Sequence, residues 1–332
     1  MKIAYFDCFS GISGDMVLGA LADLTDGPTF LREELKKLSL KGYSLSHKKV
    51  KRGVIESTKV DVKITEKNSS QKNLKDIIKI VESSSLGERI KKDSIKIFNR
   101  LAKAEASVHG TTINEVHFHE VGAIDSIVDI VGSVIGLHHL NVSKIVSSPL
   151  NTGSGFVKCD HGTLPVPVPA VMELLKGFPC FSSGIQQELT TPTGAAIITT
   201  MAEEFGPMPD LKIERVGYGA GDTDLKEIPN ALRIISGETS SESLSEEDIF
   251  VLETNIDDMN PEFYDIVIEK LFQAGAVDVF LTPIIMKKNR PAIKLSVLTQ
   301  QQNVKALANE VLKNTTSFGI RFYPVERVML ER

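Results

Sequence analysis

Short apolar runs and helical repeats of apolar residues alternate along the first two thirds of the chain. The runs that predict strands are residues 2–6, two segments within 43–66, and residues 115–119, 144–150, 211–217 and 230–236. The repeats that predict helices are residues 16–24, 29–38, 74–83, 87–108, 123–140, 169–177 and 191–206. Strands and helices that are mixed in this way indicate an α/β-type domain.

After residue 248 the pattern becomes regular. It predicts, in order, a strand over 249–255, a helix over 261–274, strands over 277–285 and 292–299, a helix over 300–313 and a strand over 319–330. This β-α-β-β-α-β order is ferredoxin-like. The Ser/Glu-rich, apolar-poor residues 238–248 predict a linker. We therefore expect an α+β protein with an α/β-type N-terminal domain over 1–237 and a C-terminal ferredoxin-like domain over 249–332.

Composition narrows the classes of function. The chain has 332 residues, of which 42% are hydrophobic and 24% charged, and this excludes disordered, collagen-like and coiled-coil proteins. A net charge of −5 and the absence of Trp argue against nucleic-acid binding. No run approaches 18 apolar residues, so no membrane span is predicted. The scattered Cys8, Cys159 and Cys180 are typical of reduced thiols in a cytoplasmic protein.

The first candidate site follows the first predicted strand, between Asp7 and Asp15. Ser10, Gly11, Ser13 and Gly14 separate these two acids. A glycine-rich turn that leads into a helix can bind an anion, and the two carboxylates can bind a divalent cation. The alternative is a capped helix with turn glycines. The segments 151–155 and 190–194 repeat the combination of hydroxyls and glycines, and the same alternatives apply there.

Two histidines and an acid form the second candidate site. His117 and His119 lie on the same face of the predicted strand, and Glu120 follows at its end. Asp125 and Asp129 are one turn apart on the next predicted helix. Imidazole and carboxylate ligands suit nickel, zinc or iron, so His117, His119 and Glu120 are candidate metal ligands. The alternative is a pair of structural histidines.

Oppositely charged loops in the second predicted domain form the third candidate site. One loop holds Glu253, Asn255, Asp257 and Asp258, and the other holds Lys287, Lys288 and Arg290. Adjacent aspartates repel each other unless a cation or a basic group neutralises them. Carboxylates bind Mg²⁺ or Mn²⁺, and Lys and Arg bind phosphates, so the two loops predict a metal–triphosphate site. The alternative is a solvated turn with surface salt bridges.

Seven motifs in order resemble one family. They are YFDCFSGISGDM, VHFHEVGAIDSIVDIVG, GSGFVKCDHGTLPVPVPA, TPTGAA, GYGAG, ETNIDDMNPE and PIIMKKNRP. Together they resemble the nickel-insertion proteins that make the nickel-pincer nucleotide cofactor of lactate racemase. The resemblance covers essentially the whole chain.

The resemblance implies a CTP-dependent nickel insertase (a nickel chelatase of the lyase class). In this family, CTP activates pyridinium-3,5-bisthiocarboxylic acid mononucleotide as a cytidylyl adduct and pyrophosphate is released. Nickel is inserted between the sulfur donors with formation of a carbon–nickel bond, and hydrolysis releases CMP and the nickel-pincer nucleotide. The C-terminal part of the family binds CTP with Mn²⁺ or Mg²⁺. The alternative is a nickel delivery or storage protein without nucleotide chemistry.

The resemblance also suggests roles for residues of the second domain. The cation is assigned to Asp257 and Asp258, the phosphates to Lys287, Lys288 and Arg290, and metal or ribose contacts to Glu253 and Asn255. Asn289, where the family often has Gly, suits a turn.

In the first domain, ligand type makes His117, His119 and Glu120 the candidates for nickel, and Cys8 or Cys159 offers a softer thiolate. We expect lactate racemase as the recipient of the product, and a homo-oligomer because the second domain has an exposed sheet. Members of the family usually continue beyond the VERVMLER that ends this chain, so the second domain is expected either to be naturally short or to lack a final segment.

Overall fold

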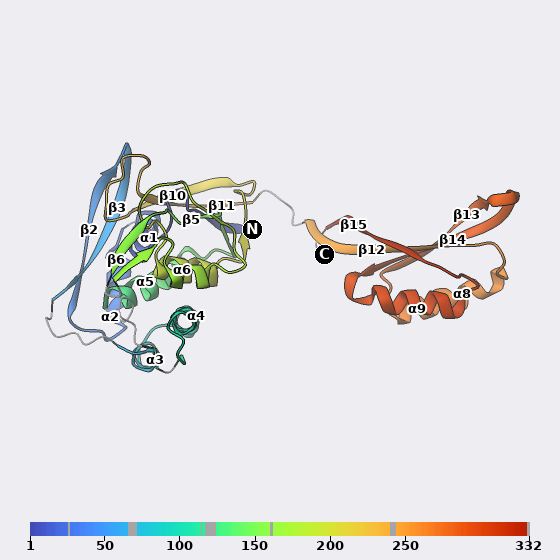
Figure 1. Ribbon diagram of the computed structural model, residues 1–332, viewed down its shortest axis with the longest axis horizontal. Coiled ribbons are helices and arrows are strands. Elements are labelled where there is room, and N and C mark those ends of the chain that lie inside the picture. The colour runs from blue at the N-terminus through green and yellow to red at the C-terminus, as the bar shows by residue number, and fades with distance from the viewer. Residues whose placement is uncertain are drawn as a thin grey trace. The chain divides into compact units, whose positions relative to one another are not determined.

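The computed structural model describes residues 1–25, 27–65, 72–113, 115–116, 124–159, 162–239 and 244–330. The chain divides into two compact units, Met1–Ser240 and Ser241–Arg332. Figure 1 colours the first unit blue to yellow and the second orange to red. Each unit has a hydrophobic core of its own.

A seven-stranded mixed sheet with the order β2-β3-β10-β11-β1-β4-β9 forms the frame of the first unit. Its strands are β1 (Lys2–Asp7), β2 (Tyr43–Arg52), β3 (Ile55–Ile64), β4 (Lys144–Ser147), β9 (Glu204–Phe205), β10 (Lys212–Ala220) and β11 (Ala231–Glu238). On either side of β1, β4 runs parallel and β11 antiparallel. Two small sheets pair β5 (Leu150–Asn151) with β8 (Cys180–Phe181) and β6 (Phe156–Cys159) with β7 (Gly162–Pro165).

The helices of the first unit gather on one side of this sheet (Figure 1). They are α1 (Gly14–Leu24), α2 (Thr29–Lys36), α3 (Leu74–Glu82), α4 (Glu88–His109), α5 (Ile124–Leu140), α6 (Pro169–Leu174) and α7 (Pro192–Met201). α1 packs on β10 and β3, and α5 packs on α1 and α4. Helix α5 is buried over most of its surface because its sequence is apolar nearly all round.

Two glycines of β10 let α1 rest directly on the sheet. A Cβ atom at Gly219 would lie 1.8 Å from the carbonyl oxygen of Met16, and one at Gly217 would lie 2.3 Å from that of Ala20. Neither position has room for a side chain. The close contact fixes the N-terminal turn of α1 at the end of the sheet where the loop after β1 emerges.

Two expectations for the first unit need correction. The helix expected over 191–206 ends at Met201, and Glu204–Phe205 forms β9, because this segment gains backbone partners at the edge of the sheet beside β4. The strand expected over 144–150 is divided into β4 and β5. The strand expected over 115–119 falls largely outside the described residues, and Glu115 and Val116 are not in a strand.

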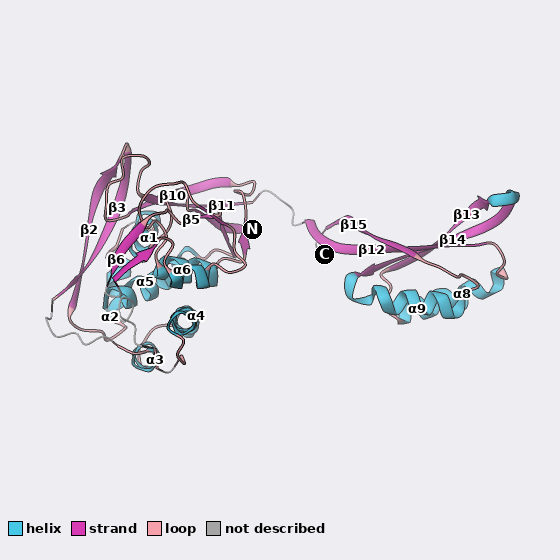
Figure 2. Cartoon of the chain, in the orientation of Figure 1, coloured by secondary structure: helices cyan, strands magenta, loops and turns pink. Residues whose placement is uncertain are grey.

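The second unit is a four-stranded antiparallel sheet with the order β13-β14-β12-β15. Its elements are β12 (Leu244–Ile256), a 3₁₀ turn (Pro261–Phe263), α8 (Tyr264–Gln273), β13 (Asp278–Met286), a 3₁₀ turn (Lys287–Asn289), β14 (Arg290–Gln300), a 3₁₀ turn (Gln301–Asn303), α9 (Val304–Asn314) and β15 (Arg321–Leu330). Figure 2 shows both helices on the same side of the sheet. Leu252, Leu295, Val267 and Leu307 pack between them. The expected α+β class is confirmed, and the order of elements is the expected β-α-β-β-α-β.

The boundary expected at residue 248 also needs correction. β12 begins at Leu244, because the backbone of 244–248 pairs with the end of β15, with Leu244 opposite Leu330 and Asp248 opposite Glu326. Backbone pairing does not require apolar side chains, so the polar composition that predicted a linker is compatible with a strand here.

We expect Gly219→Ala to destabilise the first unit by roughly 1–3 kcal/mol, because α1 must move away from β10 to admit the methyl group. Gly206→Ala is the matched control, since a Cβ there meets no atom within 4 Å. Urea unfolding of both variants checks this. Equal stability of the two variants would contradict the close contact.

Candidate functional site

Three predicted segments of hydroxyls and glycines meet at one end of the first unit. The backbone N–H of Ile12 donates to the carbonyl of Leu189 (3.0 Å), and the N–H of Thr191 donates to the carbonyl of Ile12 (3.0 Å). Asn151 Nδ2 donates to the carbonyl of Phe9 (2.8 Å). The loop after β1, the segment around β5 and the entry to α7 are therefore packed against one another.

The glycines of these loops serve close packing. A Cβ atom at Gly11 would lie 2.1 Å from the carbonyl oxygen of Leu189, and one at Gly194 would lie 2.2 Å from that of Ile12. Thr191 caps α7 by accepting the N–H of Gly194 at 3.3 Å. These positions face protein backbone. The alternative of a capped helix with turn glycines therefore explains these two glycines and the capping threonine.

Both carboxylates of the first candidate site already have cationic partners in the chain. Arg233 of β11 lies opposite Asp7 in the strand register, and its Nε donates to Asp7 Oδ2 at 3.0 Å. Asp15 accepts hydrogen bonds from Ser13 Oγ and from Lys59 Nζ. A divalent cation at Asp7 and Asp15 would have to displace these partners.

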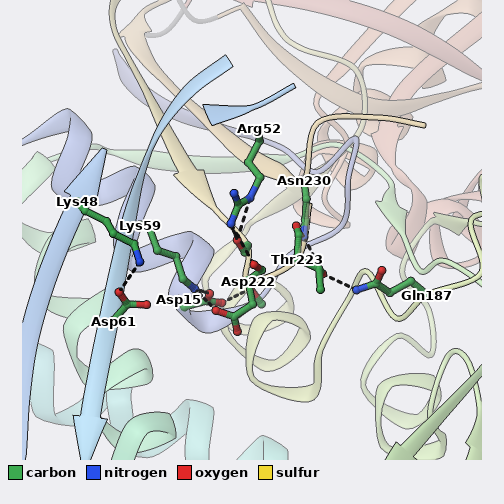
Figure 3. Close-up of polar contacts among 11 residues, drawn as sticks. Asp15, Lys48, Arg52, Lys59, Asp61, Gln187, Asp222, Thr223 and Asn230 are labelled. Atoms are coloured by element: carbon green, nitrogen blue, oxygen red, sulfur yellow. Dashed lines mark hydrogen bonds and ion pairs between the residues drawn. The ribbon is translucent and has the colours of Figure 1, made fainter. Parts of the chain in front are cut away.

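Lys59 joins the N-terminal turn of α1 to the surface (Figure 3). Its side chain projects from β3, the residue is only 4% exposed, and its ammonium pairs with Asp15 and, at 2.7 Å, with Asp222 Oδ1. The Asp222 side chain is 83% exposed, and Arg52 holds its loop by donating to the carbonyl of Gly221.

Two opposing effects act on the ammonium of Lys59. Burial lowers its pKa, but Asp15 and Asp222 more than offset this, and the pKa is raised. The buried residue is therefore kept as a cation. The sequence alone does not reveal this lysine as a buried cation, because one lysine in an alternating strand gives no signal without its partners.

Asp129 on α5 is the most perturbed acid near this network. Its Oδ1 is buried and has no hydrogen-bond partner in the described part of the chain, and a Cβ on Gly14 would lie 2.6 Å from its Oδ2. Burial raises the pKa of its carboxyl well above the usual range, and the carboxylates of Asp15 and Asp125 raise it further. The protonated form of Asp129 is therefore favoured.

In the second unit the predicted acidic and basic loops touch. Arg290 Nη1 donates to Asp257 Oδ2 at 3.2 Å, and Asp258 accepts the hydroxyl of Thr316. The contact forms because β12 pairs with β14, which sets the loop after β12 beside the first residue of β14.

Lys287 and Lys288 lie at the tip of the hairpin that joins β13 to β14. Lys288 and Asn289 have φ angles of +62° and +56°, in the left-handed region. Asn tolerates this conformation, as the turn expected at Asn289 requires. Both lysine residues are exposed beside Arg290.

A cavity of about 500 Å³ lies next to these loops. It is bounded by the start of α8 and the two hairpin strands, and the lining residues are Ile256, Asp257, Met259, Pro261, Tyr264, Pro283, Ile284, Ile285, Pro291, Ala292 and Ile293. Because these walls are mostly apolar with one carboxylate at the rim, the cavity is suited to a flat, partly apolar group.

Glu253 and Asn255 lie on the opposite face of the sheet from Ile256, since side chains alternate along β12. Glu253 is 8% exposed. It accepts a hydrogen bond from Lys294 Nζ at 2.7 Å and from Arg321 Nε at 3.0 Å, and Arg321 also donates to Asn255 Oδ1. The structure thus gives these two residues basic partners of their own, and neither residue lines the cavity that Asp257 lines.

The hydrogen bond from Lys294 lowers the pKa of Glu253 against the effect of its burial, and Arg321 adds to this. Sequence analysis did not select Lys294 or Arg321. Each of the two strands beside the strand of Glu253 carries one of these basic residues. They can be recognised as its partners only when the strand register is known.

The predicted metal ligands His117, His119 and Glu120 lie outside the described residues. Among the residues that are described, no three His, Cys, Asp or Glu side chains form a group that could hold a metal ion. The described helices include none with the length and apolar character needed to cross a membrane.

Comparisons with known proteins match both units. The family model described as nickel insertion protein matches residues 4–332. A pyridinium-3,5-bisthiocarboxylic acid mononucleotide nickel insertion protein of Desulfitobacterium hafniense (strain DSM 10664 / DCB-2) is 50% identical, over 99% of this chain and 83% of that protein. Proteins with the same description in Clostridium kluyveri and Acetivibrio thermocellus are 49% and 48% identical, over 100% of this chain and 86% and 84% of theirs.

A solved structure matches a smaller part. The C-terminal domain of a cyclometallase involved in the synthesis of the NPN cofactor of lactate racemase is 40% identical, over 25% of this chain and 58% of that one, with a TM-score of 0.25. A superposition at this score establishes no shared arrangement.

We expect Asp129→Asn to become more stabilising as the pH rises. An unfolded Asp loses its proton near its usual pKa of about 3.9. Native Asp129 keeps its proton to a higher pH, so between these two pKa values the native state binds more protons and the wild type loses stability with rising pH. The side-chain amide of the Asp129→Asn variant does not titrate, so the variant does not lose this stability as the pH rises.

Urea unfolding at about pH 5 and about pH 8 measures the effect. Asp61→Asn is the matched control, since Asp61 lies on the same strand as Lys59 and pairs with Lys48 of β2 (Figure 3). A difference between wild type and Asp129→Asn that does not grow with pH would contradict the buried, protonated acid.

We expect Glu253→Gln to lower the free energy of unfolding of the second unit by about 1–3 kcal/mol at neutral pH, because the charge between Lys294 and Arg321 is lost. The pKa of Glu253 is depressed in the native state, so its contribution is present above the usual Glu pKa of about 4.3. This contribution to stability is lost as the pH falls through the pKa that Glu253 has in the native state.

Glu310→Gln, which removes a surface partner of Lys313, serves as the control and should change stability by less than about 0.5 kcal/mol. Denaturation curves across the acid range compare both variants with the wild type. An effect of Glu253→Gln that persists unchanged at low pH would rule out the ion-pair explanation.

Proposed function

The chain belongs to the nickel insertion protein family, and on this premise we propose that it inserts nickel into pyridinium-3,5-bisthiocarboxylic acid mononucleotide to give the nickel-pincer nucleotide. Three relatives with that description match essentially the whole chain at 48–50% identity. This match across both units carries the proposal. The reaction is proposed to depend on CTP with Mn²⁺ or Mg²⁺.

The second unit is proposed to bind the nucleotide, and the contact between Asp257 and Arg290 supports this. It joins the guanidinium of Arg290 to Asp257, whose carboxylate belongs to the lining of the cavity of about 500 Å³. In the proposed complex, Lys287, Lys288 and Arg290 bind the phosphates as charge-assisted donors. The cytosine base lies against the apolar cavity wall.

The donor set near this rim fits a hard divalent cation. Asp257 and Asp258 supply carboxylate oxygens, the ligands that Mg²⁺ and Mn²⁺ prefer. The cation, when bound, supplies positive charge against the triphosphate. Asp257 and Asp258 would hold such a cation, and Arg290, released from Asp257, would be available to a phosphate. In the absence of nucleotide, the ion pair satisfies both groups.

The first unit is proposed to handle nickel and the thiocarboxylate nucleotide. His117, His119 and Glu120 are the proposed nickel ligands by donor type. Glu253 and Asn255 of the second unit are proposed to support the nucleotide site through Lys294 and Arg321 rather than from within the cavity. Lactate racemase is the proposed recipient of the product, and a homo-oligomer is the proposed assembly.

We expect the Lys287→Ala/Lys288→Ala double variant to bind CTP with Mn²⁺ at least about tenfold more weakly than the wild type, because two cations that face the phosphates are lost. The Lys305→Ala/Lys313→Ala variant removes the same charge from α9 and is the matched control. Isothermal titration with CTP, and with ATP and GTP for comparison, measures the affinities.

Saturable, metal-dependent binding that prefers CTP and is lost only in the hairpin variant supports the nucleotide site. Equal binding by both double variants, or no preference for CTP at millimolar concentration, would contradict it. Nickel binding without any effect of CTP would instead indicate a delivery or storage protein.

A further inference from the structure

A cavity in the first unit has a basic lining. It has a volume of about 640 Å³ and lies where the end of α2 meets the start of β2 (Figure 1). Sites that enclose a small organic ligand have volumes of about 300–1,000 Å³, so this cavity has room for one. The described residues that line it include three cationic side chains and no carboxylate. The lining residues are Arg32, Leu35, Lys36, Ser39, Leu40, Lys41, Tyr43, Ser44 and Leu45.

The segment that forms this cavity is much more basic than the chain as a whole. Residues 32–52 contain eight Lys and Arg but only two Asp and Glu, whereas the whole chain has a net charge of −5. β2 is an edge strand of its sheet, and lysines on an edge strand discourage pairing with other chains. That explanation does not cover Arg32, Lys36 and Lys41, which precede the strand. A hollow surface with charge of one sign attracts ligands of the opposite sign.

Each of the three cationic side chains can receive an anion. Arg32 Nη2 donates to the carbonyl of Leu45 at 3.0 Å, which holds the guanidinium between α2 and β2 and uses one of its five N–H donors. Lys36 pairs with Glu33 at 2.6 Å, but the two side chains are 64% and 61% exposed. Such an exposed pair contributes little stability, so an anionic ligand can replace Glu33. Lys41 is exposed in the connection between α2 and β2.

The remaining wall of the cavity is apolar and includes one aromatic ring. Leu35 is 2% exposed, and Leu40, Tyr43 and Leu45 pack against the core of the first unit. Burial raises the pKa of the Tyr43 phenol, so its ring is neutral at neutral pH. The face of a neutral aromatic ring attracts a cation. The cavity therefore offers cations for anionic groups and an aromatic ring for a flat cationic group.

The substrate of the proposed reaction carries the complementary groups. Pyridinium-3,5-bisthiocarboxylic acid mononucleotide has one phosphate and two thiocarboxylates, three anionic groups in all, on a molecule whose flat ring is a cation. We propose that this cavity binds the mononucleotide, with its anionic groups paired to Arg32, Lys36 and Lys41 and its pyridinium ring against Tyr43. This rests on the proposed function for the identity of the ligand. The planar guanidinium of Arg32 suits the phosphate, which it can bind through two parallel hydrogen bonds.

Isothermal titration of the whole chain with the mononucleotide, in the absence of nickel and CTP, tests this site. The Lys36→Gln/Lys41→Gln variant removes two cations of the lining. Lys48→Gln/Lys51→Gln is the matched control, because it removes the same charge from β2 at positions that do not line the cavity. Tyr43→Leu removes the aromatic ring, and Tyr43→Phe keeps it. The corresponding nucleoside, which lacks the phosphate, is titrated for comparison.

We expect saturable binding by the wild type, at least about tenfold weaker binding by Lys36→Gln/Lys41→Gln, and unchanged binding by Lys48→Gln/Lys51→Gln. Tyr43→Leu should bind about threefold to tenfold more weakly, and Tyr43→Phe should bind like the wild type. The nucleoside should bind more weakly than the mononucleotide. Circular dichroism confirms that each variant is folded. An equal loss in both double variants, unchanged binding by Lys36→Gln/Lys41→Gln, or no binding by the folded wild type at millimolar concentration would overturn the site.

The proposed function is measured separately, as nickel incorporated into the mononucleotide in the presence of CTP and Mn²⁺. If the mononucleotide binds in the cavity but the wild type incorporates no nickel, the binding site stands and the proposed function fails. If the wild type incorporates nickel and Lys36→Gln/Lys41→Gln does so with an unchanged KM for the mononucleotide, the function stands and the cavity site is overturned.

Discussion

The direct contact between the backbone of α1 and that of β10 is the constraint on which the first unit depends. It exists only because Gly217 and Gly219 have no side chains, and it sets the start of α1 against β3 and α5. From this position Asp15 reaches Lys59, and Asp129 lies against Gly14. The loop between β1 and α1 also contacts the entry of α7 through the backbone of Ile12. A change at this contact therefore moves charged groups and loops together.

Both units pair charged side chains internally. Lys59 is held between Asp15 and Asp222 in the first unit, and Asp257 is held by Arg290 in the second. Such pairs keep the charges of both partners satisfied. In the nucleotide complex that we propose for the second unit, a cation takes the place of Arg290 at Asp257, and a phosphate takes the place of Asp257 at Arg290.

Much of the architecture was predictable because local periodicity determines it. The helices and strands after residue 261 fall within a few residues of their expected bounds, and the acidic and basic loops meet because β12 pairs with β14. The order of the seven-stranded sheet was not predictable, because β10 and β11 insert between β3 and β1 across long stretches of chain.

The positions of some site residues could not be predicted from the sequence either. The burial of Lys59 and the pairing of Glu253 with Lys294 and Arg321 depend on which strands are neighbours in the sheets. Cys159 was one of two candidate thiols in the sequence, and burial of Cys8 distinguishes them.

The most direct test of the account is a complete reaction with the wild-type chain. Pyridinium-3,5-bisthiocarboxylic acid mononucleotide, Ni²⁺, Mn²⁺ and CTP are combined, and mass spectrometry follows the nucleotide. The account predicts a nickel-containing nucleotide that forms with CTP and does not form when CTP is omitted or replaced by ATP. A nickel-containing product that forms equally without CTP, or none in the complete mixture, would contradict it.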